Sequence, residues 1–105
     1  NAMQQQQLVL ENGHQLHRLD FGKLFYGKKK YFKLKIFNNT SKTLTLKLNT
    51  ELYHFSPYET KNINLTPGEY DFRASAPGVI PYIGTENLNS NQGYSWQFYI
   101  TTSRR

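Results

Sequence analysis

Cysteine is absent from the 105 residues of this chain, which excludes structural disulfides, thiolate chemistry and cysteine-ligated zinc. Acidic residues are scarce: 7 Asp and Glu stand against 13 Lys and Arg, so the formal net charge is +6. A basic domain is attracted to nucleic acid, acidic glycans, lipid headgroups or acidic proteins, and the sign of its charge does not choose among them. No apolar run approaches the roughly 20 residues of a transmembrane helix, so we expect no transmembrane segment.

Aromatic residues, by contrast, are abundant. They make up 15% of the chain, with 8 Tyr and 7 Phe, and flat rings suit the pleated surface of strands. A chain of this length with 37% hydrophobic residues has room for one core rather than two. Residues 1–3 are typical of a vector remnant and residues 4–7 of a polar, disordered lead-in. We therefore expect one β-rich domain over residues 8–105.

Alternating polarity is the main structural signal. In residues 30–37, Phe32, Leu34 and Ile36 point to one side of a strand because successive side chains alternate between faces, and three leucines do the same in residues 43–49. We interpret these strands as an antiparallel hairpin around the turn Asn-Asn-Thr-Ser-Lys. Residues 60–65 and 69–74, on either side of Thr-Pro-Gly, predict a second hairpin.

The remaining segments complete an all-β pattern. Short strands are expected at residues 8–10, 16–21 and 79–83, and Pro81 indicates an edge position or a bulge in the last of these. Residues 51–60 and 84–93 read as loops, and residues 94–101 form a final amphipathic strand with Trp96 facing the core. About seven short strands, without any helical period, predict a single antiparallel β-sandwich.

Two stretches, LDFGKLFYG at residues 19–27 and NNTSKTLTL at residues 38–46, resemble immunoglobulin-like domains of the ASH and major-sperm-protein type and their bacterial relatives. The positions that match are Phe21, Gly22, Leu24, Gly27, Asn38 and Leu44. The later segment SPYETKNINL departs from the family pattern because Tyr58 stands where the family has glycine, and the cysteines frequent in the bacterial relatives are missing. The resemblance implies an immunoglobulin-like sandwich used for protein association or scaffolding, generally without catalysis, and it carries over no binding residue.

Lysines supply the first candidate site. Lys33, Lys35 and Lys47 are expected on the outer face of the first hairpin, with residues 28–30 adding three more lysines where its first strand begins. They form either a patch for an anionic partner or a solvated face that discourages edge-to-edge aggregation. Phe32 is in phase with the core and so is withheld from stacking on bases, which disfavours nucleic acid.

Tyrosines outside the core-facing sets supply the second candidate site. Tyr53 and Tyr58 lie in the expected loop 51–60 together with Phe55, Tyr82 lies beside Pro81, and Tyr99 points away from Trp96 on the last strand. They could form a platform that stacks on sugars or contacts a protein. The alternative is structural, because small sandwiches also close their open ends with loop aromatics.

Catalytic and metal-binding patterns are weak. His14, His17 and His54 are scattered, without the spacing of a metal site. Glu69 and Asp71 share one strand face with a basic residue and fit a solvated ladder better than an acid and base pair. We therefore expect no enzyme activity, no cofactor and no metal.

Together these features predict a non-enzymatic interaction or assembly module of a bacterial extracytoplasmic protein, periplasmic or secreted, whose partner is another protein. One alternative is a carbohydrate-binding module that uses exposed tyrosines, with an acidic glycan as a possible ligand. The other is a basic nucleic-acid-binding domain, which is disfavoured and would lose affinity steeply as salt rises.

Overall fold

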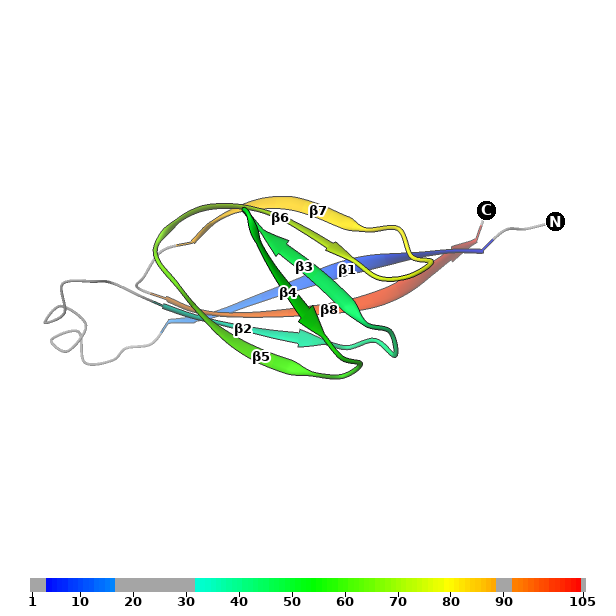
Figure 1. Cartoon of the computed structure of the whole chain (residues 1–105), viewed down its shortest axis with the longest axis horizontal. Coiled ribbons are helices and arrows are strands. Elements are labelled where there is room, and N and C mark those ends of the chain that lie inside the picture. The colour runs from blue at the N-terminus through cyan, green and yellow to red at the C-terminus, as the bar shows by residue number, and fades with distance from the viewer. Residues whose placement is uncertain (1–3, 17–31, 89–91, 105) are drawn as a thin grey trace, which may run out of the picture.

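The computed structural model describes residues 4–16, 32–88 and 92–104. These residues form eight strands in two sheets of four that pack against each other (Figure 1). Sheet A has the order β1 (Gln4–Leu16), β8 (Gln92–Arg104), β2 (Phe32–Asn38) and β5 (Thr60–Leu65). Sheet B has the order β4 (Glu51–Phe55), β3 (Leu44–Leu48), β6 (Gly68–Ser75) and β7 (Tyr82–Leu88). The predicted all-β sandwich is confirmed.

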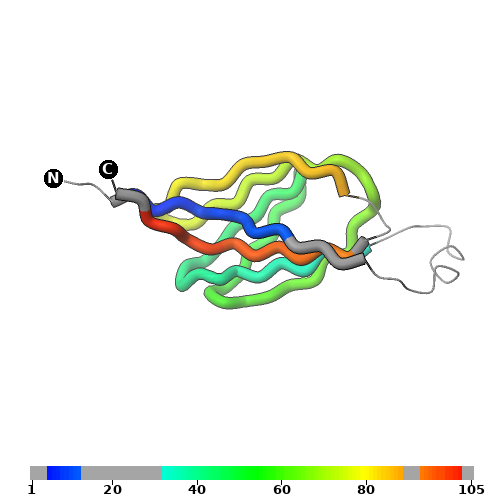
Figure 2. The backbone as a smooth tube through the Cα atoms, turned by 180° about the vertical axis from the view of Figure 1, so that it is seen from behind, coloured from blue at the N-terminus to red at the C-terminus, as the bar shows by residue number. Residues whose placement is uncertain are grey.

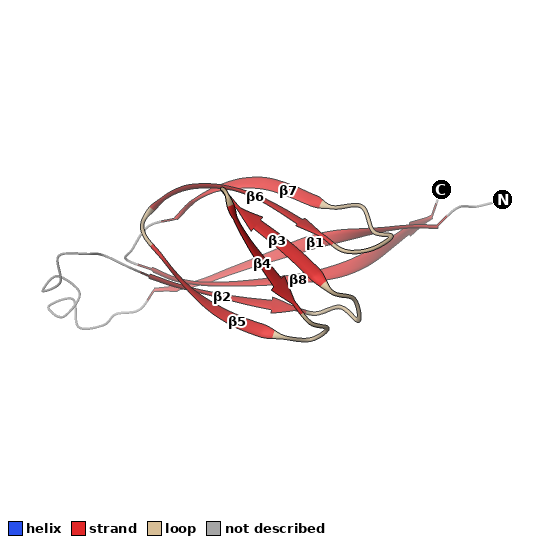
Figure 3. Cartoon of the chain, in the orientation of Figure 1, coloured by secondary structure: helices blue, strands red, loops and turns tan. Residues whose placement is uncertain are grey.

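Every element of the described chain is a strand or a loop, as Figure 3 shows. None of these residues forms a helix of the length and apolar character needed to cross a membrane. Neighbouring strands run antiparallel, except that β2 and β8 run parallel. A parallel pair needs a long crossover connection, and here most of the domain lies between the two strands.

Both predicted hairpins are wrong in one respect, because their strands belong to different sheets. β2 lies in sheet A and β3 in sheet B, and β5 and β6 are divided in the same way. A strand with one apolar face buries it equally well beside its neighbour or across the core from it, so alternation alone does not choose. Sheet B contains two other pairs of consecutive antiparallel strands, β3 with β4 and β6 with β7. The tight turn between β3 and β4 consists of residues 49–50, where Asn49 takes a positive φ of 53°, as expected of a two-residue hairpin loop.

Large side chains from both sheets meet in one core. The Trp96 side chain is 1% exposed, and its ring lies 4.8 Å from that of Phe72 and 6.2 Å from that of Phe98, measured between ring centroids. Because Trp96 belongs to β8 and Phe72 to β6, this contact joins the two layers. The predicted core position of Trp96 is confirmed.

Residues 51–55, expected to be part of a loop, form the edge strand β4. Phe55 is fully buried and pairs in register with Leu44, while Tyr53 pairs with Leu46. The strand was missed because its outward residues are exposed and a Ser-Pro turn follows directly. Residues 84–88, also expected as loop, belong to β7.

Residues 4–7 differ from the expected disorder, because they pair with residues 101–104 of β8 as the first part of β1. Figure 2 shows β1 and β8 side by side, and their paired ends extend beyond the other strands. The segment before β7 closes onto β1: the Leu8 N–H donates to the Ile80 carbonyl at 3.0 Å, and the Ile80 N–H donates to the Gln6 carbonyl at 2.8 Å. The expected strand at residues 79–83 differs from the structure: β7 begins at Tyr82, so Pro81 lies before the strand rather than within it, although β7 does occupy an edge of sheet B.

Candidate interaction surfaces

The predicted lysine patch is divided between the two outer faces of the sandwich. Lys33 and Lys35 are exposed on sheet A, where they lie opposite Asn64 and Asn62. Lys47 is exposed on sheet B. The prediction that the three share one face is wrong, because it rested on the hairpin that does not form. Residues 28–30 and the motif at residues 19–27 lie outside the described residues.

Two of the four candidate tyrosines pack into the fold. Tyr53 is half-buried against the core, and burial raises the pKa of its phenol, with smaller contributions from Glu51 and Tyr70. The Tyr82 ring stacks on that of Phe72 with 5.8 Å between centroids and 21° between planes. Both rings contribute to packing, which leaves less of their surface for a ligand.

Tyr58 is the most exposed of the four, at 60%. It follows Pro57 in a turn where the Glu59 N–H donates to the Ser56 carbonyl at 3.1 Å and the Ser56 N–H donates to Glu59 Oε1 at 2.7 Å. Its φ is 59°, which is costly for a bulky residue and natural for glycine. A glycine would adopt this conformation without that cost, whereas Tyr58 adopts it with backbone strain.

The turn at Tyr58 is held by the fully buried Asn38 at the end of β2. The Asn38 amide donates to the Ser56 carbonyl at 2.9 Å and to the Lys42 carbonyl at 2.8 Å, and the Thr40 hydroxyl donates to Asn38 Oδ1 at 2.8 Å. One side chain thus joins the β2–β3 loop to the β4–β5 turn. Because buried polar groups are costly when unpaired, this network fixes both loops at one end of the sandwich.

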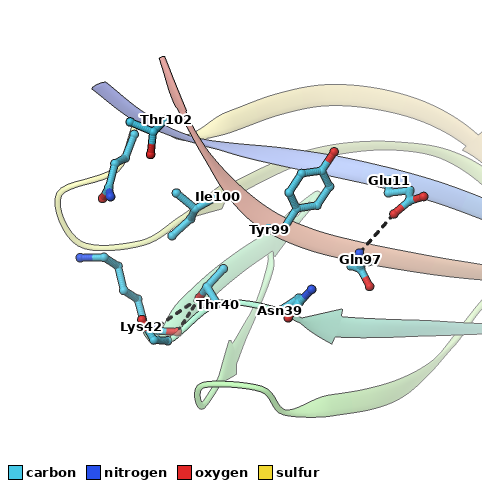
Figure 4. A pocket seen from close by; sticks show the side chains of 10 residues that line it. Glu11, Asn39, Thr40, Lys42, Gln97, Tyr99, Ile100 and Thr102 are labelled. Atoms are coloured by element: carbon cyan, nitrogen blue, oxygen red, sulfur yellow. Dashed lines mark hydrogen bonds between the residues drawn. The ribbon is translucent and has the colours of Figure 1, made fainter. Parts of the chain in front are cut away.

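Tyr99 borders an open, polar hollow of about 570 Å³ beside the β2–β3 loop (Figure 4). The Gln97 amide at this site donates to Glu11 Oε1 at 3.1 Å. The lining otherwise consists of Gln6, Asn39, Thr40, Ser41, Lys42, Ile100 and Thr102. This is the one candidate tyrosine that meets several polar side chains around a shared space.

A row of four side chains crosses the outer face of sheet B. The strand registers place Leu52 opposite Lys47, Lys47 opposite Arg73, and Arg73 opposite Ile83. Leu52 is 58% exposed and Ile83 69% exposed, and the two cations between them are exposed as well. With about 4.8 Å between strands, this cation row spans roughly 14 Å. We use the name cation row for Leu52, Lys47, Arg73 and Ile83 below.

Neither cation of the row forms a salt bridge with another described residue. Asp71, two residues before Arg73 on the same face of β6, instead accepts a hydrogen bond from the Thr85 hydroxyl at 2.9 Å. An open hollow of about 680 Å³ lies over this part of the sheet, lined by Lys47, Asp71, Arg73, Ile83 and Thr85 among others. The site therefore presents two positive charges that lack a salt-bridge partner among the described residues, and they lie between two exposed aliphatic side chains.

Of this row, sequence reasoning named only Lys47 as a contact residue. Leu52 lay in a segment read as loop, and Ile83 lay in the strand interrupted by Pro81. Arg73 was placed in a charge ladder with Glu69 and Asp71. The sequence could have indicated that Leu52 and Ile83 are exposed, because they alternate with the core-facing residues beside them. Their alignment with two cations depends on strand order.

Comparison of the chain with models of protein families, with curated proteins and with solved structures gave no match.

Proposed function

We propose that this chain is a non-enzymatic interaction module, built on an immunoglobulin-like sandwich, that binds another protein through the outer face of sheet B. The cation row carries this proposal. Like charges directly opposite each other on neighbouring strands destabilise a sheet, and exposed aliphatic side chains gain nothing from water. A partner with a carboxylate between two apolar contacts would relieve both costs.

The partner suited to this row is an acidic protein surface with exposed aliphatic or aromatic side chains. Charge attraction would speed its approach and set its orientation, while Leu52 and Ile83 would supply the apolar contact that stabilises a complex. The extracytoplasmic location expected from the sequence remains part of this proposal.

The alternatives receive less support from the geometry. A carbohydrate platform loses Tyr53 and Tyr82 to packing, and Tyr58 and Tyr99 lie on different structural elements rather than on one flat surface. A nucleic-acid groove needs a continuous basic track, whereas the described lysines of the predicted patch lie on two opposite faces.

The test begins with a photo-crosslinking amino acid at position 83, and at position 35 on sheet A as the matched control. Each variant is exposed to an extract of the source organism, and proteins joined only at position 83 are identified by mass spectrometry. The affinity of the identified protein is then measured for the wild type, for Ile83→Ser and for the sheet A control Phe37→Ser. We expect Ile83→Ser to weaken binding about tenfold or more, equivalent to about 1.4 kcal/mol, and Phe37→Ser to leave it unchanged. Equal crosslinking at both positions, or equal losses of affinity, would reject sheet B as the binding face.

A further inference from the structure

β8 has a strand neighbour on both sides for only part of its length. β1 pairs with it from Gln92 to Arg104, whereas β2 pairs with it from Tyr94 to Phe98. The Asn39 N–H then donates to the Phe98 carbonyl at 2.8 Å, and the chain continues into sheet B. Beyond Phe98, no described residue pairs with β8 on the β2 side. Residues 4–7 and 101–104 thus form a ribbon at the end of sheet A, with an open edge along β8 and with Ile80 covering part of the edge along β1.

The open side of this ribbon presents backbone groups in ladder geometry. Backbone N–H and C=O groups of successive strand residues point to alternate sides, and the Phe98 carbonyl points toward β2. The same groups of Ile100 and Thr102 therefore face the open side. The backbone groups of Gln6 and Leu8 in β1 likewise point away from the other strand of the ribbon, and they bond to Ile80.

The space beside this edge is open enough for another strand. It is the 570 Å³ hollow lined by Tyr99, Ile100 and Thr102 on one side and by the β2–β3 loop on the other, as Figure 4 shows. A two-stranded ribbon is at best marginally stable in water, and a third strand would stabilise it.

We propose that the strand that fills this space belongs to a second copy of the chain, with β8 pairing antiparallel to β8 across a two-fold axis. The charge distribution favours this occupant. The chain carries +6, yet no charged residue occurs in residues 4–10 or 92–103, so the pairing strands bring fewer like charges together than the lysine-bearing strands would. Lys42 and Glu11, which line the same hollow, carry opposite charges. Residues 94–103 also contain no proline or glycine and many strand-forming residues, which is the composition of self-pairing segments.

Backbone phase lets only even-numbered positions of the two copies exchange hydrogen bonds, because their N–H and C=O groups face the open side. β2 and Asn39 occupy that side of β8 as far as Phe98, so the second copy pairs only beyond Phe98. Placing residue 102 on the two-fold axis satisfies both conditions, because Ile100 then lies opposite position 104 of the second copy and the two Arg104 residues lie at opposite ends of the contact. Natural sheet edges that avoid such pairing carry lysine, proline or a bulge. Residues 94–103 contain neither lysine nor proline.

The test is sedimentation velocity across a dilution series of the wild type, Thr102→Pro and Thr102→Val. Proline removes the one N–H at position 102, which faces the open side, and leaves the pairing of Thr101 with β1 intact. Valine keeps that N–H. We expect the wild type and Thr102→Val to dimerise as concentration rises, and Thr102→Pro to stay monomeric with an unchanged unfolding midpoint.

Hydrogen exchange gives a second measurement that needs no variant. In the wild type, the amides of Ile100 and Thr102 should exchange more slowly as the dimer forms, whereas the amide of Thr101, paired with β1, should be protected at every concentration. A wild type that is monomeric throughout, or a folded Thr102→Pro that dimerises equally well, would overturn the proposal. Because the cation row lies on the other sheet, Ile83→Ser should leave dimerisation unchanged, which separates this test from that of the proposed function.

Discussion

The outer faces of the two sheets both carry exposed cations, but the neighbours of those cations differ. On sheet A, Lys33 lies opposite Asn64, and Lys35 lies opposite Asn62 on one side and Ser95 on the other. On sheet B, Lys47 lies opposite Arg73, with Leu52 beyond one cation and Ile83 beyond the other. Uncharged polar neighbours let a lysine remain solvated, whereas like charges and exposed aliphatic groups leave unfavourable interactions that a ligand can relieve.

This difference shows that the number of lysines on a strand says little about binding. Lys35 and Lys47 both alternate with apolar residues in the sequence and look alike there. Their roles diverge only after the fold supplies their cross-strand neighbours.

Trp96→Ala should lower the stability of the fold more than any other substitution considered, because Trp96 lies in the core that joins the two sheets. The ring is buried and contacts Phe72 of the opposite sheet. Truncating a buried ring of this size costs about 3–5 kcal/mol of unfolding free energy. Chemical denaturation measures this loss, with Gln97→Ala on the outer face of the same strand as the control. An unchanged midpoint for Trp96→Ala would mean that the layers are not joined through this ring.

Asn38→Ala should have the next largest effect. The change removes two amide donors from the carbonyls of Lys42 and Ser56 and one acceptor from Thr40. Each buried polar group left unpaired costs about 1–3 kcal/mol, so we expect a total loss of roughly 2–4 kcal/mol after partial rescue by water. The exposed neighbour Asn39 supplies the control Asn39→Ala. Equal losses for the two variants would contradict the bridging role of Asn38.

Alternation predicted the strand faces and the core position of Trp96 from sequence, because one buried face imposes a period of two whatever the topology. It did not predict the division of strands between sheets. β2 and β3 bury the same apolar residues whether they lie side by side or face each other, so the sequence pattern is identical for both arrangements. β4 was missed because an edge strand followed by Ser-Pro carries few of the usual strand signals.

The candidate site was predictable to a smaller extent for the same reason. Lys47 could be placed outward from its own strand alone. Its neighbours Leu52 and Arg73 lie 5 and 26 positions away in the sequence, and only the strand order β4-β3-β6 brings all three together. A surface built across strands is a property of topology, and local periodicity contains no information about it.

Tyr58→Gly, in the turn between β4 and β5, should increase the stability of the fold. Relieving a left-handed conformation recovers about 1–2 kcal/mol, from which the greater backbone entropy of unfolded glycine subtracts about 0.5–1 kcal/mol. The expected net gain is about 0.5–1 kcal/mol, measured as a higher unfolding midpoint. Tyr58→Ala retains the backbone strain and should show no gain. A loss on Tyr58→Gly would indicate that the exposed ring stabilises the fold by packing.

The two faces can be compared most directly with the matched substitutions Lys47→Glu and Lys35→Glu. Lys47→Glu replaces a like-charge pair opposite Arg73 with an opposite-charge pair, so it should stabilise the fold by about 0.2–1 kcal/mol. Asp71 lies on the diagonal from position 47, farther away than Arg73, and it reduces this gain without cancelling it. Lys35→Glu faces Asn62 and Ser95 and should change stability by no more than about 0.5 kcal/mol in either direction.

Thermal unfolding at low and high ionic strength distinguishes a charge effect from a change in strand propensity. The gain from Lys47→Glu should shrink as salt rises, because exposed charges are screened within about 10 Å at 0.1 M salt. The same variant should bind the acidic partner more weakly, since it removes one of the two cations that would meet a carboxylate. Greater stability together with weaker binding is the combination expected of a surface whose unfavourable contacts serve recognition. If both substitutions shift the midpoint alike at every salt concentration, the opposition of Lys47 and Arg73 has no energetic consequence, and sheet B is as fully solvated as sheet A.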